Sequence, residues 1–416
     1  MLNIPSIRQS HCLNRHSSYK AAIPQQLNNN TLPQDHLANI QQNISPDDDI
    51  PRACSYYADY SGCGYWRLHW PEYIINCSQK GIVQGSTVIY RDPSVYAASR
   101  SIRIQRQAAD HQLEFVEWLV NFRAQAGLDY KIIYEVDDIV FEEDIPDYNK
   151  FKPAFTGGTT RSNILKIIGM CDEMSVTNDF MRDYYKAKTG MQNVTVVPNF
   201  PPKFWIGNFF NHAKVCSRYD KHKRRPRILY TGSGAHFDVE NKVNQKDDFQ
   251  HVIKNIIDTR KKFQWVFIGA FPLQLQPYVQ SGEIEFHPWC RLYEYPYLVD
   301  KLEPTAMIAP LIDNTFNRAK SDIKFTEANA FGVPIVCQDI VTYKDAPHKF
   351  TTGDEMIDSL EKILKNGPRY RKNSMYYRSL ADKNWLELEQ NIECFNELYM
   401  HPYKSPQRKH LVRFNP

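Results

Sequence analysis

The feature that most constrains the fold is an alternation of short apolar strands with helices, which occurs twice along the 416 residues. In the first array KIIYEVDD and EMSVTN are typical of strands, whereas SNILKIIGM and DFMRDYYKAKTG are typical of helices. We also expect a strand at STVIYRD and a helix over residues 101–126. Strands that alternate with helices predict parallel sheets with helices on both faces. The chain is therefore expected to be an α/β protein with doubly wound sheets.

The alternation lapses in PPKFWIGNFFNHAKVCSRYDKHKRRPR and restarts at RILYTGSG. We expect Rossmann-like domains at 51–208 and 227–375, joined by a linker at 209–226. Residues 1–50 are rich in Gln, Asn, Ser and Pro, which predicts a disordered N-terminal extension. Residues 376–416 are expected to add a helix and a basic tail.

Bulk composition excludes several classes of protein. The 51 basic and 47 acidic residues give a net charge of +4, too small to indicate a nucleic-acid-binding protein by itself. The 9 cysteines contain no CxxC pair, so neither a disulfide framework nor a zinc site is expected. The sequence has no apolar run of transmembrane length and no segment typical of a signal peptide. We therefore expect a cytoplasmic protein.

Two strand-to-helix turns carry glycine-rich loops. SGCGYW contains Gly62 and Gly64, and TGSGAH, which follows the strand RILY, contains Gly232 and Ser233. Backbone amides at the start of a helix bind phosphate because the helix dipole is positive there. Two doubly wound domains direct such loops towards one cleft, which predicts a shared phosphate ligand. For either loop alone, a tight turn is the alternative explanation.

The segment KSDIKFTEANAFGVPIVCQD predicts a short helix that stops at GVP before a buried strand. Lys320, Ser321 and Lys324 place two cations and a hydroxyl beside the start of this helix, a combination that suits a diphosphate. Glu327 has two acceptor oxygens, which match the two hydroxyls of a ribose. The alternative is an ion pair between Glu327 and Lys324 on the helix surface.

Three further polar residues are expected near the cleft. Asp137 and Asp138 end the strand KIIYEVDD and are expected to lie near the acceptor or the transferred sugar, with loop capping as the alternative. VDD is not a DxD motif, so no residue is assigned as a metal ligand, although the sequence leaves a metal requirement open. His236 follows the second glycine loop and is expected to contact the diphosphate or the sugar; otherwise it is an ordinary polar loop residue.

Together, the motifs in residues 51–346 resemble GT-B glycosyltransferases, most closely the retaining family-four group. TGSGAH, QWVFIGA and KSDIKFTEANAFGVPIVCQD resemble the nucleotide-sugar domain of that group, and DYSGCGYWRLHWP, CDEMSVTNDFMRDYY and NVTVVPN resemble its N-terminal acceptor domain. The resemblance implies transfer of a sugar from a nucleoside-diphosphate sugar to an acceptor hydroxyl, with retention of configuration. Many members carry another glutamate eight residues before Glu327. Here that position is Ala319, and Asp313 or Asp322 is the expected substitute.

The acceptor is the least constrained part of the prediction. Basic clusters with aromatic neighbours, KHKRRPR, KNGPRYRKNSMYYR and HPYKSPQRKHLVRF, suit a polyanion. Because some phage enzymes of the GT-B fold modify hydroxymethylated DNA bases, our leading acceptor is such a base, flipped out of the duplex in the host cytoplasm. The alternatives are a lipopolysaccharide or capsule glycan as acceptor, and a non-catalytic nucleotide- or DNA-binding module of the same fold. The sugar, the nucleotide and the oligomeric state stay open.

Overall fold

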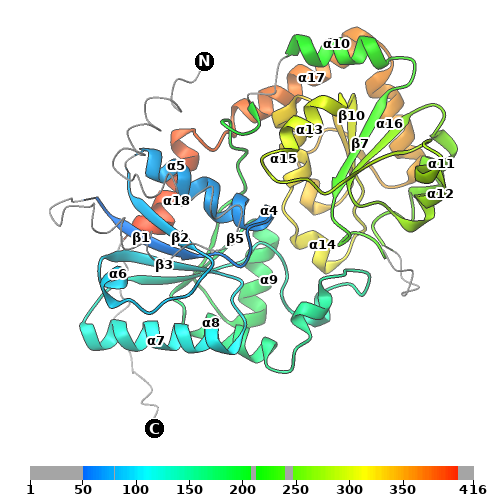
Figure 1. Ribbon diagram of the computed structural model, residues 1–416. Coiled ribbons are helices and arrows are strands. Elements are labelled where there is room, and N and C mark those ends of the chain that lie inside the picture. Colours follow the sequence, from blue (N-terminus) through cyan, green and yellow to red (C-terminus); the bar gives the residue numbers. More distant parts are fainter. Residues whose placement is uncertain (1–49, 79, 208–211, 239–246, 402–416) are drawn as a thin grey trace.

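The computed structural model describes residues 50–78, 80–207, 212–238 and 247–401, which form two α/β domains side by side (Figure 1). The expected N-terminal extension and basic tail fall outside these ranges, apart from one residue of each. Among the described residues, no helix is both long and apolar enough to cross a membrane.

The first domain contains a sheet of six parallel strands in the order β2-β1-β3-β4-β5-β6. Its strands are β1 (Arg52–Tyr56), β2 (Ile82–Ser86), β3 (Ser99–Gln105), β4 (Lys131–Glu135), β5 (Glu173–Val176) and β6 (Val194–Val196). Its helices are α4 (Gly62–Gly64), a π-helix (Tyr65–His69), α5 (Trp70–Ser78), α6 (Pro93–Ala97), α7 (Asp110–Ala126), α8 (Thr160–Met170) and α9 (Asp179–Thr189). The strands are buried on both faces, as a parallel sheet between two helix layers requires.

The second domain repeats this design in the order β12-β11-β10-β7-β8-β9, again with parallel strands. Its strands are β7 (Arg227–Gly232), β8 (Gln264–Gly269), β9 (Glu285–Pro288), β10 (Ala306–Ala309), β11 (Ile335–Gln338) and β12 (Lys349–Phe350). Its helices are α10 (His212–His222), α11 (Ile253–Thr259), α12 (Gln276–Gln280), α13 (Tyr295–Leu302), α14 (Thr315–Ala319), α15 (Ile323–Phe331), α16 (Gly353–Leu364) and α17 (Gly367–Asp382). The expected fold class, two doubly wound Rossmann-like domains, is confirmed.

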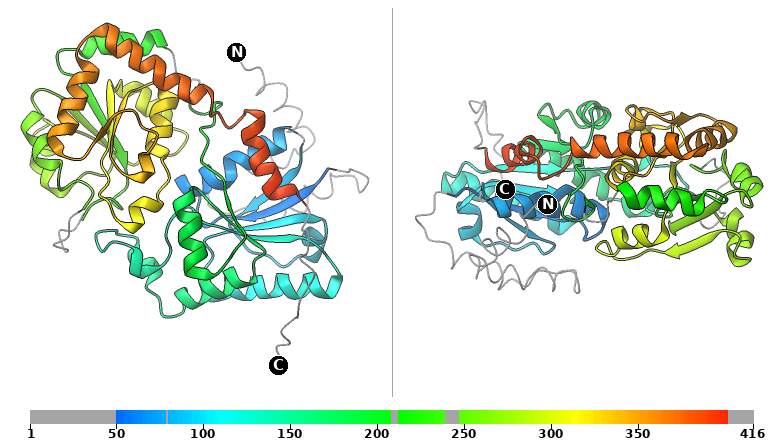
Figure 2. Two further views of the ribbon diagram at one scale, coloured as in Figure 1. Left: turned by 180° about the vertical axis from the view of Figure 1, so that it is seen from behind. Right: turned by 90° about the horizontal axis from the view of Figure 1, so that it is seen from above.

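The chain crosses between the domains twice. It passes to the second domain after β6, and it returns after α17 to place the last described helix, α18 (Glu389–Met400), against β1, β3 and α5 (Figure 2). The two crossing segments are bonded to each other, since the carboxylate of Glu387 accepts hydrogen bonds from the amides of Lys203 at 2.9 Å and Phe204 at 2.8 Å. The C-terminal part of the chain therefore belongs structurally to both domains.

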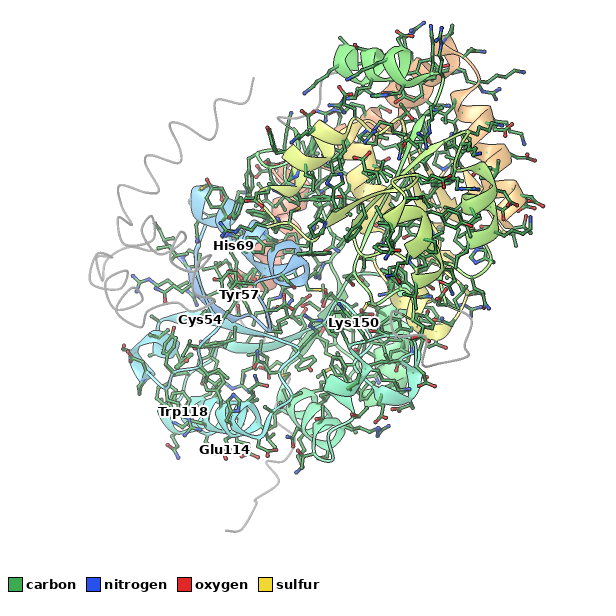
Figure 3. All side chains as sticks on the ribbon, turned by 45° about the vertical axis from the view of Figure 1, so that its right-hand side comes forward. Cys54, Tyr57, His69, Glu114, Trp118 and Lys150 are labelled. Carbon is green, nitrogen blue, oxygen red and sulfur yellow. The ribbon has the colours of Figure 1, made fainter. Side chains whose placement is uncertain are left out.

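A segment of the first domain also extends towards the second. It runs from the end of β4 to α8 and contains two short 3₁₀ helices, at Glu142–Asp144 and Lys152–Phe155. Lys150 in this segment lies where the domains meet, whereas Glu114 and Trp118 of α7 lie on the outer side of the first domain (Figure 3). We refer to residues 139–158 as the bridging segment.

Three local predictions were wrong. Residues 101–105 belong to β3 rather than to a helix, because their polar members face a buried ion cluster and so hide the strand pattern. The strand expected at STVIYRD lies earlier, at β2, where Gly85 lets the Tyr57 ring pack against the backbone. Residues 212–222, expected in a linker, form helix α10, which packs against α17.

The buried ion cluster joins three elements of the first domain. Glu135, at the end of β4, lies between Arg67 of the π-helix (Nε to Oε1, 2.6 Å) and Arg103 of β3 (Nε to Oε2, 3.1 Å). All three side chains are fully buried. Burial by itself would raise the pKa of Glu135, but Arg103 and Arg67 lower it, so the carboxylate is ionised.

We expect Glu135→Gln to lower the free energy of unfolding by about 3–5 kcal/mol, because two buried guanidinium groups lose their counter-ion. Chemical denaturation measures this. Glu389→Gln is the matched control, because Glu389 pairs with Lys80 at the exposed surface and its loss should cost less than about 1 kcal/mol. Equal effects of the two substitutions would contradict the structural role given to the cluster.

Candidate functional site

A cavity of about 270 Å³ lies between the two domains, at the carboxyl ends of both sheets. In a doubly wound sheet this edge, where the strand order reverses, is the usual place for a ligand. In the second sheet the order reverses between β7 and β10, and the cavity lies beside the last residues of β7. The lining residues are Gly62, Cys63, Trp66, Asp137, Asp138, Thr231, Gly232, His236, Ile268, Trp289, Cys290, Leu292, Tyr295, Lys320, Ser321, Ile323, Lys324, Glu327 and Tyr343.

The structure brings the sequence-predicted residues together at this cavity, with two exceptions. Gly64 packs against the backbone of Asp59, and a Cβ added to it would lie 2.0 Å from the Asp59 carbonyl oxygen. The Ser233 hydroxyl accepts a hydrogen bond from the Ala235 amide at 3.3 Å. Both residues therefore shape their loops rather than line the cavity.

Glu327 is a buried cavity residue and not part of a surface ion pair. It is 7% exposed, and its Oε2 accepts a hydrogen bond from the Tyr295 hydroxyl at 2.8 Å. Burial raises the pKa of Glu327 to about 7, although the hydrogen bond from Tyr295 and the charge of Lys324 oppose that rise. A cavity carboxyl group whose ionised form is destabilised by burial in this way is typical of a functional site.

Lys324, one turn before Glu327 on α15, is the second charged residue in the cavity. Its Nζ lies 3.3 Å from Nε2 of His236 and 5.5 Å from the centre of the Tyr230 ring. Burial lowers the pKa of Lys324 to about 8, with the charge of Lys320 acting in the same direction. No carboxylate of the described residues forms an ion pair with this ammonium, although the charges of Glu327 and Asp248 act on it. This is the state expected of a cation that binds an anionic ligand.

Lys320 and Asp138 connect the two domains across the cavity. The Nζ of Lys320 lies 3.5 Å from Oδ2 of Asp138 and 4.4 Å from the centre of the Phe316 ring. Asn178 of the first domain reinforces the contact, because its Nδ2 donates to the backbone carbonyls of Ala319 at 2.9 Å and Lys320 at 3.1 Å. Lys320 is thus placed both to bind a ligand and to hold the domains together.

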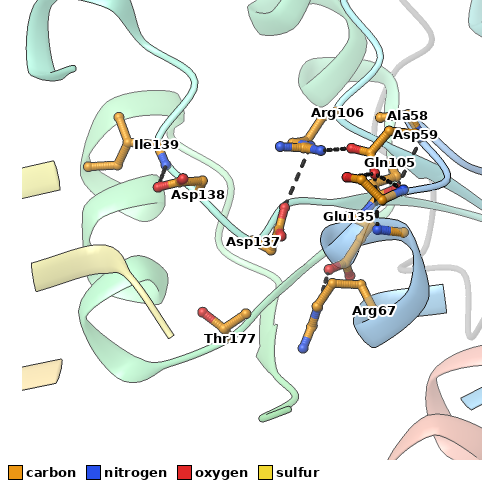
Figure 4. A network of polar contacts seen from close by, with 12 residues as sticks. Ala58, Asp59, Arg67, Gln105, Arg106, Glu135, Asp137, Asp138, Ile139 and Thr177 are labelled. Carbon is orange, nitrogen blue, oxygen red and sulfur yellow. Dashed lines mark hydrogen bonds and ion pairs between the residues drawn. The ribbon is translucent and has the colours of Figure 1, made fainter. Parts of the chain in front are cut away.

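Asp137 points towards Arg106, which also forms an ion pair with Asp59 (Figure 4). The Asp137 Oδ1 lies 3.5 Å from Nε of Arg106. Arg106 has a positive φ of 47°, a conformation that a non-glycine residue adopts at an energetic cost. The two adjacent aspartates therefore have different surroundings, Asp137 within the first domain and Asp138 at the domain interface.

The expected substitutes for a glutamate at position 319 are not in the cavity. Asp313 forms an exposed ion pair with Arg318, at 2.6 Å between Oδ1 and Nε. Asp322 accepts a hydrogen bond from Thr326 Oγ1 at 3.4 Å and does not line the cavity. Ala319 itself is fully buried in the apolar core of the first domain, where a carboxylate would be desolvated.

Sequence reasoning did not identify the aromatic wall of the cavity, formed by Trp289, Tyr295 and Tyr343. Trp289 is 61% exposed, and it packs over Gly269, where an added Cβ would lie 2.8 Å from the indole ring. Gly269 has a φ of 95°, so both its conformation and its lack of a side chain are required. The run HPWCRLYEYPY was the available signal, but aromatic residues near a strand end more often belong to a core.

No group of three or more metal-ligating side chains lies together among the described residues. The basic segment at Lys223 and Arg224 directly precedes β7, whereas the cavity adjoins Gly232 at the other end of that strand. The cavity and this basic cluster are therefore at opposite ends of the second sheet.

Comparison with known proteins gives likeness of fold only. No protein-family model matches the chain, and no curated protein matches it by sequence. Similar solved structures include TarM (TM-score 0.46, 8% identity, covering 72% of this chain and 54% of TarM), so this chain spans about half the length of TarM. A UDP-forming α,α-trehalose-phosphate synthase from Burkholderia xenovorans has a TM-score of 0.44 and 12% identity, covering 81% of this chain and 82% of the synthase. The wall teichoic acid polymerase TagF has a TM-score of 0.40 and 10% identity, covering 93% of this chain and 97% of TagF.

We expect Glu327→Gln to stabilise the protein in a pH-dependent way. Because the folded state raises the pKa of Glu327 from 4.5 to about 7, the wild-type protein loses stability as the pH rises through that window. The uncharged amide removes the loss, so the variant should gain up to about 3 kcal/mol over wild type by pH 7 and little at pH 4. Urea denaturation at a series of pH values measures this difference in the free energy of unfolding. A pH-independent difference, or the same gain in Glu117→Gln on the exposed side of α7, would refute the assignment.

Proposed function

We propose that the chain is a glycosyltransferase that moves a sugar from a nucleoside-diphosphate sugar to an acceptor hydroxyl. The observation that carries the proposal is an interdomain cavity that holds two lysines and a buried glutamate on one short segment, Lys320, Lys324 and Glu327. A nucleoside diphosphate combines a polyanion with a polyhydroxyl ring, and these side chains complement both parts.

The proposed donor binds mainly to the second domain. Lys324 and the backbone at Gly232 contact the diphosphate, and Lys320 reaches it from the domain interface. Glu327, oriented by Tyr295, accepts hydrogen bonds from the ribose. The exposed face of Trp289 at the cavity stacks on the base.

The proposed chemistry depends on the stabilisation of the leaving diphosphate. As the anomeric bond breaks, negative charge grows on the phosphate oxygens, and Lys320 and Lys324 stabilise it in a cavity of low polarity. Asp137 and Asp138 approach from the first domain, where the acceptor hydroxyl would lie. Closure of the two domains excludes water and so limits hydrolysis of the donor. Retention of configuration, as in the family-four group, is part of the proposal.

For the acceptor we propose a hydroxymethylated base in DNA, with a growing glycan as the alternative. An exposed aromatic ring stacks on either a base or a sugar. The cluster at Lys223 and Arg224 gives little support for DNA at this cavity, because the six residues of β7 separate the two by about 20 Å. The choice between the acceptors therefore depends on a measurement of transfer.

A donor-hydrolysis screen tests the proposed activity. The purified protein is incubated with a panel of sugar nucleotides, alone, with hydroxymethylated DNA, and with bacterial glycan acceptors. We expect nucleoside diphosphate to be released from one donor, and the release to accelerate with the true acceptor. Acceleration by glycan and not by DNA would replace the DNA proposal. No release from any donor, together with intact nucleotide binding, would identify a non-catalytic module of the same fold.

We expect Trp289→Ala to raise the donor KM about tenfold while kcat changes little, because a stacking contact made equally in the ground and transition states contributes mainly to binding. Steady-state kinetics on the donor found in the screen measure both constants. Tyr297→Ala is the matched control, because Tyr297 is equally exposed at 61% but does not line the cavity. The same rise in KM in both variants would exclude Trp289 as the base platform.

A further inference from the structure

A chain of hydrogen bonds leads from the bridging segment of the first domain to the cavity lysine. Tyr148 of that segment is 4% exposed, and its hydroxyl lies 3.1 Å from Oδ1 of Asp248 in the second domain. The other oxygen of Asp248, Oδ2, lies 2.8 Å from Nδ1 of His236. Nε2 of His236 in turn lies 3.3 Å from Nζ of Lys324. Neither Tyr148 nor Asp248 lines the cavity, yet both act on a residue that does.

The donors and acceptors in this chain determine the tautomer of His236. A lysine ammonium only donates, so Nε2 of His236 must accept and carry no proton. Nδ1 then carries the proton and donates it to Asp248. Burial lowers the pKa of His236 well below its usual value, with Lys324 and Lys320 acting in the same direction, so the ring is neutral.

Asp248 is held in place by donors from several elements. Besides His236, its Oδ1 accepts hydrogen bonds from Asn317 Nδ2 at 2.6 Å and from the Ile312 amide at 3.1 Å. Its own amide donates to the His236 carbonyl at 3.1 Å, so the two residues are joined by both backbone and side chain. Asp248 is fully buried. A buried carboxylate with this many donors has a fixed orientation, and its hydrogen bond with Nδ1 in turn fixes the orientation of the imidazole ring.

Tyr148 makes the arrangement depend on the contact between the domains. Its hydroxyl also accepts hydrogen bonds from Asn314 Nδ2 at 3.3 Å and Asn317 Nδ2 at 3.2 Å. The hydroxyl that donates to Asp248 therefore belongs to the first domain, and residues of the second domain orient it. If the domains separate, Asp248 loses this donor.

We propose that Asp248 and Tyr148 are positioning residues for Lys324. Asp248 fixes the Nδ1–H tautomer of His236, and Nε2 of that ring holds the Lys324 ammonium at the cavity. Tyr148 completes this arrangement only when the domains are docked. The inference rests on the proposed function insofar as Lys324 binds the donor diphosphate. It adds a link from domain closure to the cation that binds the leaving group.

The tautomer of His236 is measured first, without any ligand. Nitrogen NMR of protein labelled with ¹⁵N-histidine distinguishes a protonated Nδ1 from a protonated Nε2, and the His236→Gln spectrum assigns the signal. In the wild type we expect a neutral ring with the proton on Nδ1. Asp248→Asn should move the proton to Nε2, because an asparagine amide that donates to Nδ1 leaves only Nε2 to carry it. A wild-type ring with its proton on Nε2 would overturn the proposal.

Inorganic pyrophosphate then reports the effect on Lys324, by isothermal titration calorimetry. We expect Asp248→Asn to weaken binding about tenfold, the usual effect of losing a charge-assisted hydrogen bond that orients a ligand-binding group. Tyr148→Phe should weaken binding by a smaller factor and leave the tautomer unchanged. Wild-type affinity in both variants would overturn the proposal.

Two controls separate a positioning role from a structural one. Asp247→Asn changes a neighbouring buried aspartate whose donors among the described residues are backbone amides, those of Asp238, Phe249 and Gln250. It should leave both the tautomer and the affinity unchanged. Tyr184→Phe removes another tyrosine–aspartate hydrogen bond of the first domain, to Asp144, and should have no effect on binding. If Asp248→Asn does not fold, the wild-type tautomer and Tyr148→Phe decide the question. If the wild type binds no pyrophosphate, the proposed donor function fails, while the tautomer still tests Asp248.

Discussion

The ion cluster around Glu135 is the interaction on which the rest of the structure depends. Its two arginines come from the π-helix that follows the first glycine loop and from the central strand β3. Glu135 itself lies two residues before Asp137 and Asp138. The cluster thereby fixes the two first-domain segments that line the cavity. Arg103 also donates to the Tyr399 hydroxyl at 2.9 Å, which holds the C-terminal helix α18 on the first domain. Since buried charges are stable only when they are paired, these elements must form together.

A second set of contacts sets the position of one domain relative to the other. Asn178, Asp138 and Tyr148 of the first domain bind the 312–320 region and Asp248 of the second, close to the cavity. Apolar packing accompanies these polar contacts, since one buried core includes Trp66 and Trp70 of the first domain and Tyr295 of the second, and Ala319 of α14 packs into the core of the first domain. The proposed transfer reaction needs the domains to move apart for donor entry and product release, so part of this packing must open together with the polar contacts.

Much of the fold could be predicted from the sequence because parallel strands and their helices leave local patterns. The glycine loops, the helix before GVP and most strands are where the pattern indicates. The strand β3 was missed because Ser101, Arg103 and Gln105 alternate with apolar residues yet are themselves buried, a case in which a buried ion cluster replaces an apolar face. Helix α10 was missed because its charged residues conceal the few that pack, Val215, Arg218 and Tyr219.

The sequence by itself determined the fold class, most of the elements and which segments at the strand ends would contain Lys320, Lys324, Glu327 and His236. These depend on local propensity and on the rule that parallel strands end at one edge. Only the tertiary structure decided what those residues contact. Burial made Glu327 a cavity carboxylate instead of a surface ion pair, and the packing of α14 put Ala319 in an apolar core. Domain docking brought Tyr148 to Asp248 from 100 residues away, and the fold of the second domain brought Asp248 to His236 from 12 residues away. Such long-range contacts depend on how the elements pack in three dimensions, and a local sequence pattern does not predict them.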